Sequence, residues 1–206
     1  PNRPDALGVR GIARDLAARG LGVLKTCDVE AVPASFKTDV SVAIDADTLD
    51  GCPVFCGRVI QGVKNAPSPA WMQDALRAIG LRPISFLVDV TNYFTYDQNR
   101  PLHVFDMDKV KGNLRVHRAK GGETIVALDD KEYTLQAGQM AISDDNSVES
   151  IAGVMGGLES GCTDETVNVF VESAYWDPIQ IAYTGRALKI NSDARYRFER
   201  GVDHAF

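Results

Sequence analysis

Two spacings of apolar residues alternate along the chain, a helical one of three to four residues and a strand-like one of two. The helical spacing is found in residues 5–20, 68–80, 84–94 and 177–190. The strand-like spacing is found in residues 40–44, 54–63, 114–143 and 167–176. This mixture predicts an α+β fold, in which mixed strands form a meander or sandwich-like core with helices packed on it.

Residue types at the segment ends indicate where the helices begin and stop. Asp5 is the predicted N-cap of the first helix and Gly20 its end. Ser68 and Gly80 delimit the second helix in the same way, and Asp177 caps the last one. The expected apolar faces are Val9, Ile12, Ala13 and Leu16 in the first helix, and Met72, Ala75, Leu76 and Ile79 in the second.

The third helical segment, "ISFLVDVTNYF", keeps Ile84, Leu87, Val88 and Thr91 at helical spacing. We therefore expect a buried helix, with Thr91 and Asn92 near its end. The runs "LRVHRA", "TIVAL", "EYTL" and "MAIS" follow, separated by glycine and aspartate turns. They predict a meander of strands, and "VNVFVESAYW" predicts one more strand.

Composition and charge limit the class of protein. With 206 residues, 45% of them hydrophobic, the chain can bury a core as one domain with a short appendage. No apolar run approaches the roughly 20 residues of a membrane span, no leader opens the chain, and a cytoplasmic protein is expected. The net charge of −6 has the wrong sign for a surface that grips nucleic acid by neutralising phosphates. A start without methionine suggests a piece of a longer protein.

The four cysteines, Cys27, Cys52, Cys56 and Cys162, lack paired C-x-x-C spacing. A period of two places Cys52 and Cys56 on the same face of one strand. Core thiols are the simpler interpretation, because a zinc site needs two more ligands that the sequence does not offer.

Three features carry candidate chemistry, and each has a structural alternative. His103 in "PLHVFD" is either a site residue or a histidine whose ring is tied to the backbone. Glu172 ends an apolar run, where a buried carboxylate needs a partner, but it can also point to solvent. The cluster "AGVMGGLESG" matches neither nucleotide-binding glycine motif. Gly156 and Gly157 either let bare backbone approach a ligand or form a plain turn.

Five motifs stand in a fixed order, "DVTNY", "PLHVFD", "AGVMGGLESG", "VNVFVES" and "NSDARYRFERGVD", after an opening "NRPD". This set, from Asn2 to Asp203, resembles the B3/B4 editing region of bacterial phenylalanyl-tRNA synthetase beta subunits. The resemblance implies hydrolysis of tyrosine wrongly attached to tRNA(Phe). A non-catalytic tRNA-binding or architectural module and a freestanding trans-editing deacylase are the alternatives.

The resemblance also implies roles for single residues. Glu172 is expected to accept a hydrogen bond from the tyrosine phenol as an ionised carboxylate. His103 and Asn92 are the expected catalytic residues, with His103 directing water at the ester. Thr91 is expected to give a polar group to the aminoacyl moiety. Because neither G-x-S-x-G nor a suitable cysteine nucleophile is present, the expected hydrolysis is non-covalent.

Four further positions, Gly156, Gly157, Ser192 and Ala194, belong to the expected pocket, and Arg195 is a nearby departure from the family pattern. Gly156 and Gly157 line it with backbone and polarise the ester carbonyl, and Ala194 is a small residue in its wall. Ser192 stands where the family commonly has threonine, so the hydroxyl is kept and a methyl is lost. Arg195 stands where many relatives have a small polar residue.

The resemblance finally implies an organisation and partners. Residues 1–35 are expected to be an N-terminal helix and connector from a preceding domain, and residues 36–206 the editing domain. The expected partners are the 3′ end of tRNA(Phe) and an alpha subunit in an (αβ)₂ assembly, with no membrane. ATP and magnesium belong to the synthetic site of the whole enzyme, and this fragment is expected to need no cofactor or metal.

Overall fold

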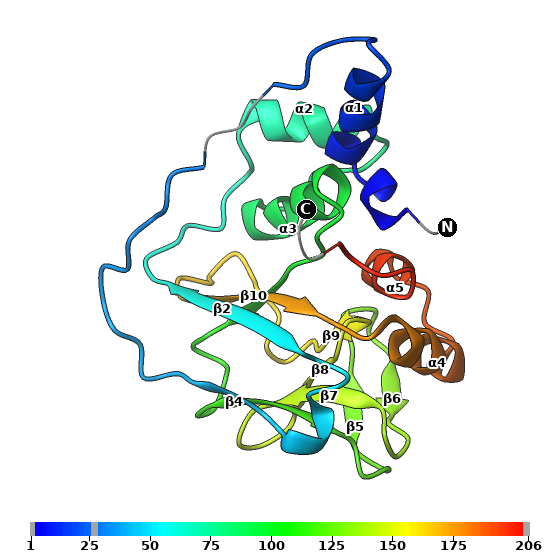
Figure 1. Cartoon of the computed structure of the whole chain (residues 1–206). Helices are drawn as coiled ribbons and strands as arrows, with labels where there is room; N and C mark the ends of the chain where they lie inside the picture. Colours follow the sequence, from blue (N-terminus) through cyan, green and yellow to red (C-terminus); the bar gives the residue numbers. More distant parts are fainter. Residues whose placement is uncertain (1–2, 26–28, 204–206) are drawn as a thin grey trace.

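The computed structural model describes residues 3–25 and 29–203, so Cys27 lies outside the described residues. Its helical elements are η1 (Pro4–Leu7), α1 (Val9–Ala18), η2 (Ala46–Thr48), α2 (Ala70–Ala78), α3 (Phe86–Asp97), α4 (Pro178–Leu188) and α5 (Asp193–Phe198). Its strands are β1 (Val42–Ile44), β2 (Val54–Ile60), β3 (His103–Asp106), β4 (Leu114–Arg118), β5 (Thr124–Val126), β6 (Glu132–Thr134), β7 (Met140–Ser143), β8 (Val148–Ile151), β9 (Met155–Gly156) and β10 (Val169–Tyr175). The α+β class is confirmed, and helices α1 to α3 gather at one end of the molecule (Figure 1).

The strands of the described residues form three sheets. One is antiparallel with the order β2-β10-β3, one has five strands in the order β1-β4-β7-β8-β9, and β5 and β6 form a separate pair. The expected meander is only partly right, because β4 pairs with β7 while β1 joins β4 in parallel. Turn signals locate the ends of strands but do not decide which strands pair, so the sequence did not reveal that the β5–β6 hairpin leaves the sheet.

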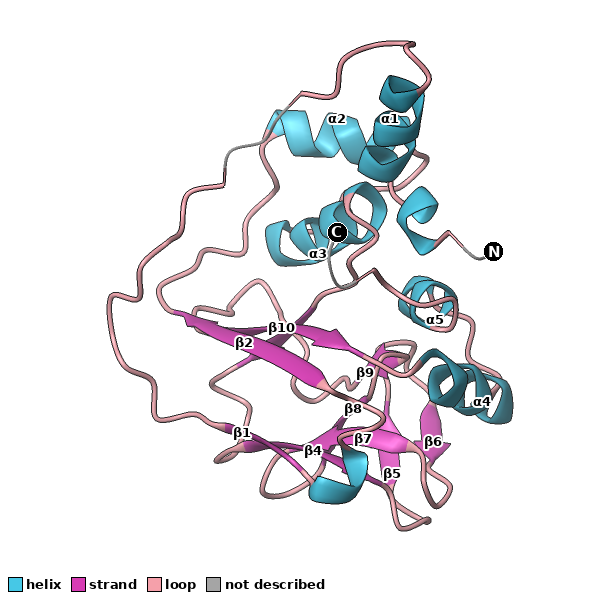
Figure 2. Ribbon diagram, in the orientation of Figure 1, coloured by secondary structure: helices cyan, strands magenta, loops and turns pink. Residues whose placement is uncertain are grey.

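The two larger sheets share one hydrophobic core. Figure 2 shows the three-stranded sheet between α3 and the five-stranded sheet. Phe105 and Phe170 of the first sheet belong to the same buried cluster as Val116 and Ile142 of the second. Trp176, just after β10, is 1% exposed and meets Phe55 edge-on at 6.5 Å between ring centroids. This core fixes β3 and β10, the two strands that carry His103 and Glu172.

The first helix forms where the sequence predicts it, but its expected cap is wrong. Gly8 is the N-cap of α1, and Asp5 lies in the preceding 3₁₀ turn. The Asp5 carboxylate accepts hydrogen bonds from Arg3 and Arg14, so it is engaged in ion pairs instead of capping. Gly20 does end the helical segment, with a φ of 77°.

The apolar face of α1 is largely uncovered in this chain. Val9, Ile12 and Leu16 are 50%, 49% and 48% exposed. The N-terminus of the helix nevertheless packs closely, because a Cβ on Gly8 would lie 2.7 Å from the carbonyl oxygen of Asp97 at the end of α3. The division at residue 35 stays a prediction.

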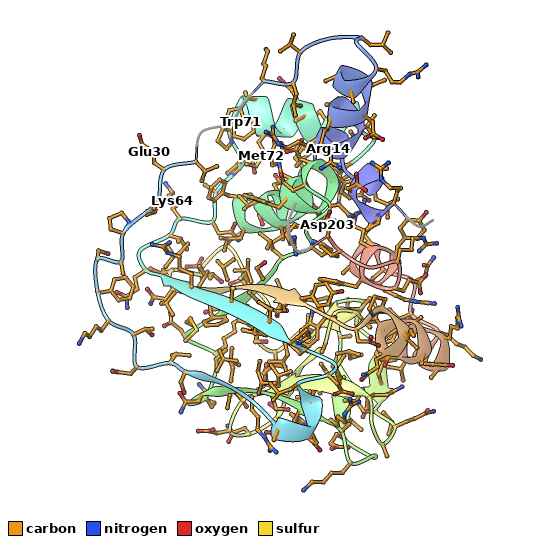
Figure 3. All side chains as sticks on the ribbon, viewed as in Figure 1. Arg14, Glu30, Lys64, Trp71, Met72 and Asp203 are labelled. Carbon is orange, nitrogen blue, oxygen red and sulfur yellow. The ribbon has the colours of Figure 1, made fainter. Side chains whose placement is uncertain are left out.

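The second helix also begins later than expected. Pro69 is its N-cap, and the Ser68 hydroxyl donates to the Asp89 carboxylate at 2.5 Å. Met72 is buried whereas its neighbour Trp71 is 58% exposed; both belong to α2 (Figure 3). Gly80, with a φ of 85°, ends the helical segment as predicted.

The third helix runs past its expected end, so Thr91 and Asn92 lie in its middle. Its N-terminal turn is anchored by Asn65, whose side-chain oxygen accepts from the Leu87 amide at 3.0 Å. Beyond its C-terminus, Arg100 donates to the carbonyl of Asp203 at 2.6 Å, and Figure 3 labels Asp203 near α5. The helix is thus held at both ends.

The cysteine prediction is wrong for one pair. Cys52 is fully buried just before β2, whereas Cys56 within β2 is exposed, so they do not share a face. The cause is that β2 begins only at Val54, and the period of two does not extend back to Cys52. Among the described helices, none is long and apolar enough to cross a membrane.

Candidate functional site

A cavity of about 380 Å³ lies between α3, β3 and the turn through β9. Thr91 and Asn92 line it from α3, His103 from β3, Gly156 from β9 and Ala194 from α5. Five residues expected to form one pocket are therefore brought together by elements far apart in the sequence. The remaining wall is mostly apolar, formed by Leu87, Val88, Leu102, Val104, Leu128, Val154 and Met155.

A smaller chamber of about 60 Å³ adjoins this cavity. The two share His103, Gly156 and Ala194 as walls, and Glu172 lines only the smaller one. We call the larger space the outer chamber and the smaller one the inner chamber. The inner chamber can hold several waters, since one water needs roughly 10–15 Å³ of such volume.

His103 and Glu172 are direct cross-strand neighbours, paired between β3 and β10. Side chains of such a pair point to the same face, with Cβ atoms about 5 Å apart. The His103 ring meets Phe105 edge-on at 4.3 Å between centroids. On the other side of β10, Glu172 faces Gly57, whose missing side chain leaves room for the Phe170 ring. Aromatic packing therefore fixes both polar groups.

Each of the two polar groups has one buried atom without a hydrogen-bond partner. Glu172 is 6% exposed, and its Oε2 and the Nε2 of His103 have no hydrogen-bond partner. Buried polar atoms of this kind are costly and are normally satisfied by a protein group, a water or a ligand. Two orphaned atoms in the walls of one small chamber indicate a binding site for a polar group.

Burial also sets the charge of the site. It raises the pKa of Glu172 to about 8, because the charged form loses its hydration. It lowers the pKa of His103 to about 4 for the same reason. Both groups are therefore largely neutral at pH 7. Glu172 is thus largely protonated, in contrast to the expected ionised carboxylate, and His103 is a weak base.

Stability is expected to fall as the pH rises from 6.5 to 8, by roughly 1.4 kcal/mol per unit from this site. Unfolded glutamate is ionised in this range, whereas folded Glu172, with a pKa of about 8, keeps its proton. Between pH 4.5 and 6.5 His103 offsets this trend, because the unfolded ring takes up a proton that the buried ring does not. The free energy of unfolding of Glu172→Gln, measured with denaturant, should not fall above pH 6.5. An equal dependence of this free energy on pH in wild type and in the variant would contradict the prediction.

Two expected pocket residues, Gly157 and Ser192, lie outside the walls of both chambers. The Gly157 amide donates to the Glu149 carbonyl at 2.7 Å, so that donor is already engaged and does not point at a ligand. Gly156 does line both chambers, and its carbonyl accepts from the Leu128 amide at 3.0 Å. Repeated glycines in the sequence do not show which one faces a cavity, because that depends on strand pairing.

Ser192 caps α5 and does not line either chamber. Its hydroxyl accepts from the Arg195 amide at 3.1 Å and donates to the Val154 carbonyl at 2.6 Å. Arg195 pairs with Glu199 at 3.0 Å and covers Gly185 of α4. Both departures from the family pattern thus serve the packing of α5, which carries Ala194.

Replacing Ser192 by alanine is expected to cost about 1 kcal/mol of stability, the usual loss for an N-cap. Substrate affinity should change little, because the hydroxyl is turned to backbone groups of α5 and Val154. Chemical denaturation measures the loss of stability, and the KM for the hydrolysis that the family resemblance leads us to expect measures the effect on affinity. A large rise in KM at unchanged stability would show that Ser192 contributes to substrate binding.

The sequence reasoning missed several wall residues. Asp129 and Cys162 line the outer chamber, and Ser150 lines the inner one. Burial raises the pKa of the Cys162 thiol to about 11, which makes it a poor nucleophile. The sequence indicated only that Asp129 lies in a turn between two strands, and a turn does not by itself indicate a cavity. Among the described residues, no group of three His, Cys, Asp or Glu side chains is placed to hold a metal ion.

The Thr91 hydroxyl donates to the Val88 carbonyl at 2.8 Å within α3. Its oxygen can still accept a hydrogen bond, so Thr91 offers the outer chamber an acceptor. Asn92 offers both a donor and an acceptor beside it. The polar side of the outer chamber is therefore suited to a group with both donors and acceptors, such as a ribose or an ester.

Comparison with known proteins identifies this arrangement. The chain belongs to the B3/4 domain family, which matches it over residues 51–206. It is 73% identical over 206 residues to the phenylalanine–tRNA ligase beta subunit of Ruegeria pomeroyi and 68% identical over 207 residues to that of Cereibacter sphaeroides. Each alignment covers 100% of this chain and 26% of the relative, so the chain spans about a quarter of these subunits. The resemblance to the B3/B4 region of this subunit is confirmed.

A solved structure is similar in fold. An N-terminal fragment of the phenylalanyl-tRNA synthetase beta-subunit from Pyrococcus horikoshii matches with a TM-score of 0.53 and 19% identity. The match covers 91% of this chain and 58% of that one. At this identity the likeness concerns the fold alone.

Proposed function

We propose that this chain is a post-transfer editing domain that hydrolyses Tyr-tRNA(Phe) and spares Phe-tRNA(Phe). The observation that carries the proposal is the buried, unpartnered Glu172 oxygen in the wall of the inner chamber. A phenol hydroxyl is a polar group that can satisfy it, and the aromatic ring can occupy the space between Met155, Leu102 and Ala194.

Such a site can bind tyrosine in preference to phenylalanine, whereas a synthetic site must bind phenylalanine in preference to tyrosine. A hydrophobic pocket that accepts phenylalanine rejects an added hydroxyl only weakly. A pocket with buried polar groups rejects the ligand that lacks the hydroxyl, because those groups then stay unpaired. Discrimination of order 10⁴ is attainable in this way. Neutral Glu172 can accept from the phenol with its carbonyl oxygen and donate with its own O–H.

Hydrolysis itself needs a positioned water and support for the charge that develops on the ester oxygen. With the phenol in the inner chamber, the ester falls in the outer chamber, where Thr91 and Asn92 present polar atoms. His103 borders both chambers and, being largely neutral, is suited to orient a water rather than to act as a strong base. A nucleophilic residue is not required.

The whole subunit supplies the rest of the proposed context. The relatives are named beta subunits of phenylalanine–tRNA ligase. We infer from them that the protein acts in the cytoplasm with an alpha subunit in an (αβ)₂ assembly, and that ATP and magnesium serve the synthetic site. The tRNA body is then held mainly elsewhere, which agrees with the net charge of −6 on this chain.

The test is deacylation by the full-length synthetase that contains this region. Tyr-tRNA(Phe) and Phe-tRNA(Phe) are incubated with enzyme, and release of each amino acid is followed above the spontaneous rate. Selective loss of the tyrosyl ester is expected. If the enzyme spares both esters, the non-catalytic architectural alternative is favoured instead. If the enzyme hydrolyses both esters at equal rates, Glu172 does not determine which ester is hydrolysed, and the specificity argument is wrong.

A further inference from the structure

The walls of the two chambers contain one side chain that carries a full charge at neutral pH. Glu172 and His103 are held largely neutral by burial. Asp129 lines the outer chamber, and no lysine or arginine lies among the described residues of either wall. The outer chamber thus has a single negative charge in its wall and no cation in that wall, because Lys131, which pairs with Asp129, lies outside it. Its chemistry favours a positively charged group.

Asp129 is held in place by its own turn. Its Oδ1 accepts from the Lys131 amide at 3.3 Å, and its Oδ2 accepts from the Tyr133 hydroxyl at 2.8 Å. The hydrogen bond from Tyr133 lowers the pKa of the Asp129 carboxyl, with a further contribution from Lys131. The Lys131 ammonium lies 3.0 Å away, but its side chain is 70% exposed, and an exposed ion pair of this kind is weak.

The position of Asp129 relative to the inner chamber is fixed by the backbone. It follows Leu128 directly, and the Leu128 amide donates to the carbonyl of Gly156 at 3.0 Å. Gly156 forms part of the wall of both chambers. A ligand that places one end near Glu172 and passes Gly156 therefore reaches the part of the outer chamber where Asp129 lies.

We propose that Asp129 binds the α-ammonium group of the aminoacyl ester and so selects esters with a free amino group. The inference rests on the editing function proposed above, and it adds a second point of recognition. Glu172 recognises the far end of the side chain, and Asp129 recognises the charge next to the reacting carbonyl. Together they fix the direction of the amino acid across both chambers. The α-amino group is the cation that such a substrate carries, and it titrates near neutrality.

The test uses an ester of the same shape without the charge. Deamination of Tyr-tRNA(Phe) with nitrous acid gives the 3-(4-hydroxyphenyl)lactyl ester, in which a hydroxyl replaces the ammonium. The kcat/KM of the full-length synthetase for both esters is measured with wild type and with Asp129→Asn. Asparagine keeps an oxygen for the Lys131 amide, so the turn is retained while the charge is lost.

Asp129→Asn is expected to lower kcat/KM for the tyrosyl ester about tenfold. This factor corresponds to the lower end of the free energies found for hydrogen bonds to charged groups. The hydroxyacyl ester should be hydrolysed by the variant as fast as by wild type. The matched control is Asp130→Asn, since Asp130 is exposed, lies outside both walls and has a φ of 60° that asparagine tolerates.

The outcomes separate the two proposals. Suppose that wild type cleaves the tyrosyl ester and that Asp129→Asn leaves its kcat/KM unchanged, or lowers kcat/KM for both esters equally. The role proposed for Asp129 is then wrong, while the proposed editing function is retained. If wild type cleaves neither ester, the editing function fails and the inference fails with it. Thermal unfolding of each variant shows whether a lost rate reflects lost structure.

Discussion

Replacing Glu172 by alanine is expected to lower kcat/KM for Tyr-tRNA(Phe) about a hundredfold in the full-length synthetase. Alanine removes the carboxyl that lines the inner chamber, where its Oε2 has no other partner. The phenol would then enter an apolar space and lose the hydrogen bonds that it makes in water. Hydrolysis of Phe-tRNA(Phe), which is expected to be slow in wild type, should not fall in parallel, because a phenyl ring cannot make a hydrogen bond to Glu172.

Glu172→Gln is the matched variant, because it keeps the size of the side chain and is neutral at every pH. Burial holds Glu172 largely neutral at pH 7, with a pKa of about 8. The glutamine enzyme should therefore retain most of the tyrosyl activity, within about tenfold of wild type. If glutamine is as harmful as alanine, binding of the phenol requires the ionised carboxylate, and the protonated form of Glu172 is not the active one.

Replacing Gly156 by alanine is expected to reduce deacylation by about a hundredfold, the scale of a misplaced reacting group. A Cβ at this position would lie 2.2 Å from Cε1 and 2.7 Å from Nε2 of the His103 ring. The ring cannot retreat freely, because it packs edge-on against Phe105, which is fully buried. The ring must therefore turn into one of the chambers, or the strands must separate.

The loss of activity should exceed the loss of stability for Gly156→Ala. Overpacking of this kind costs about 1–3 kcal/mol, which thermal unfolding measures. Gly22→Ala is the control, since nothing lies within 4 Å of a Cβ there and the φ is not positive. A Gly156→Ala enzyme with full tyrosyl activity would show that substrate does not pass His103, and the site would have to be sought elsewhere.

The sequence predicted most elements because their signals are local. Asp177 accepts a hydrogen bond from the Gln180 amide as the predicted cap of α4. Apolar spacing predicted the presence of α3, although not its end at Asp97. Local signals failed where a distant group competed. Ser68 does not cap α2 because its hydroxyl bonds to Asp89, and Asp5 does not cap α1 because two arginines hold it.

The site was only partly predictable for the same reason. The resemblance to a known family pointed to His103, Glu172 and Ala194, which the structure places around the inner chamber. It also pointed to Gly157 and Ser192, whose polar atoms are engaged with Glu149 and Val154. Asp129 was missed, since its place in the wall depends on the contact between Leu128 and Gly156, which no periodicity reveals.

The pairing of β3 with β10 limits how this site can change over evolution. His103 stands opposite Glu172, and Phe105 stands opposite Phe170, so one face of the sheet carries both the polar pair and its aromatic support. Inserting or deleting a single residue within one strand would turn the side chains of that strand beyond the change to the opposite face, away from their partners. Lengths can vary in the connecting loops, but within these two strands specificity can be altered only by substitution.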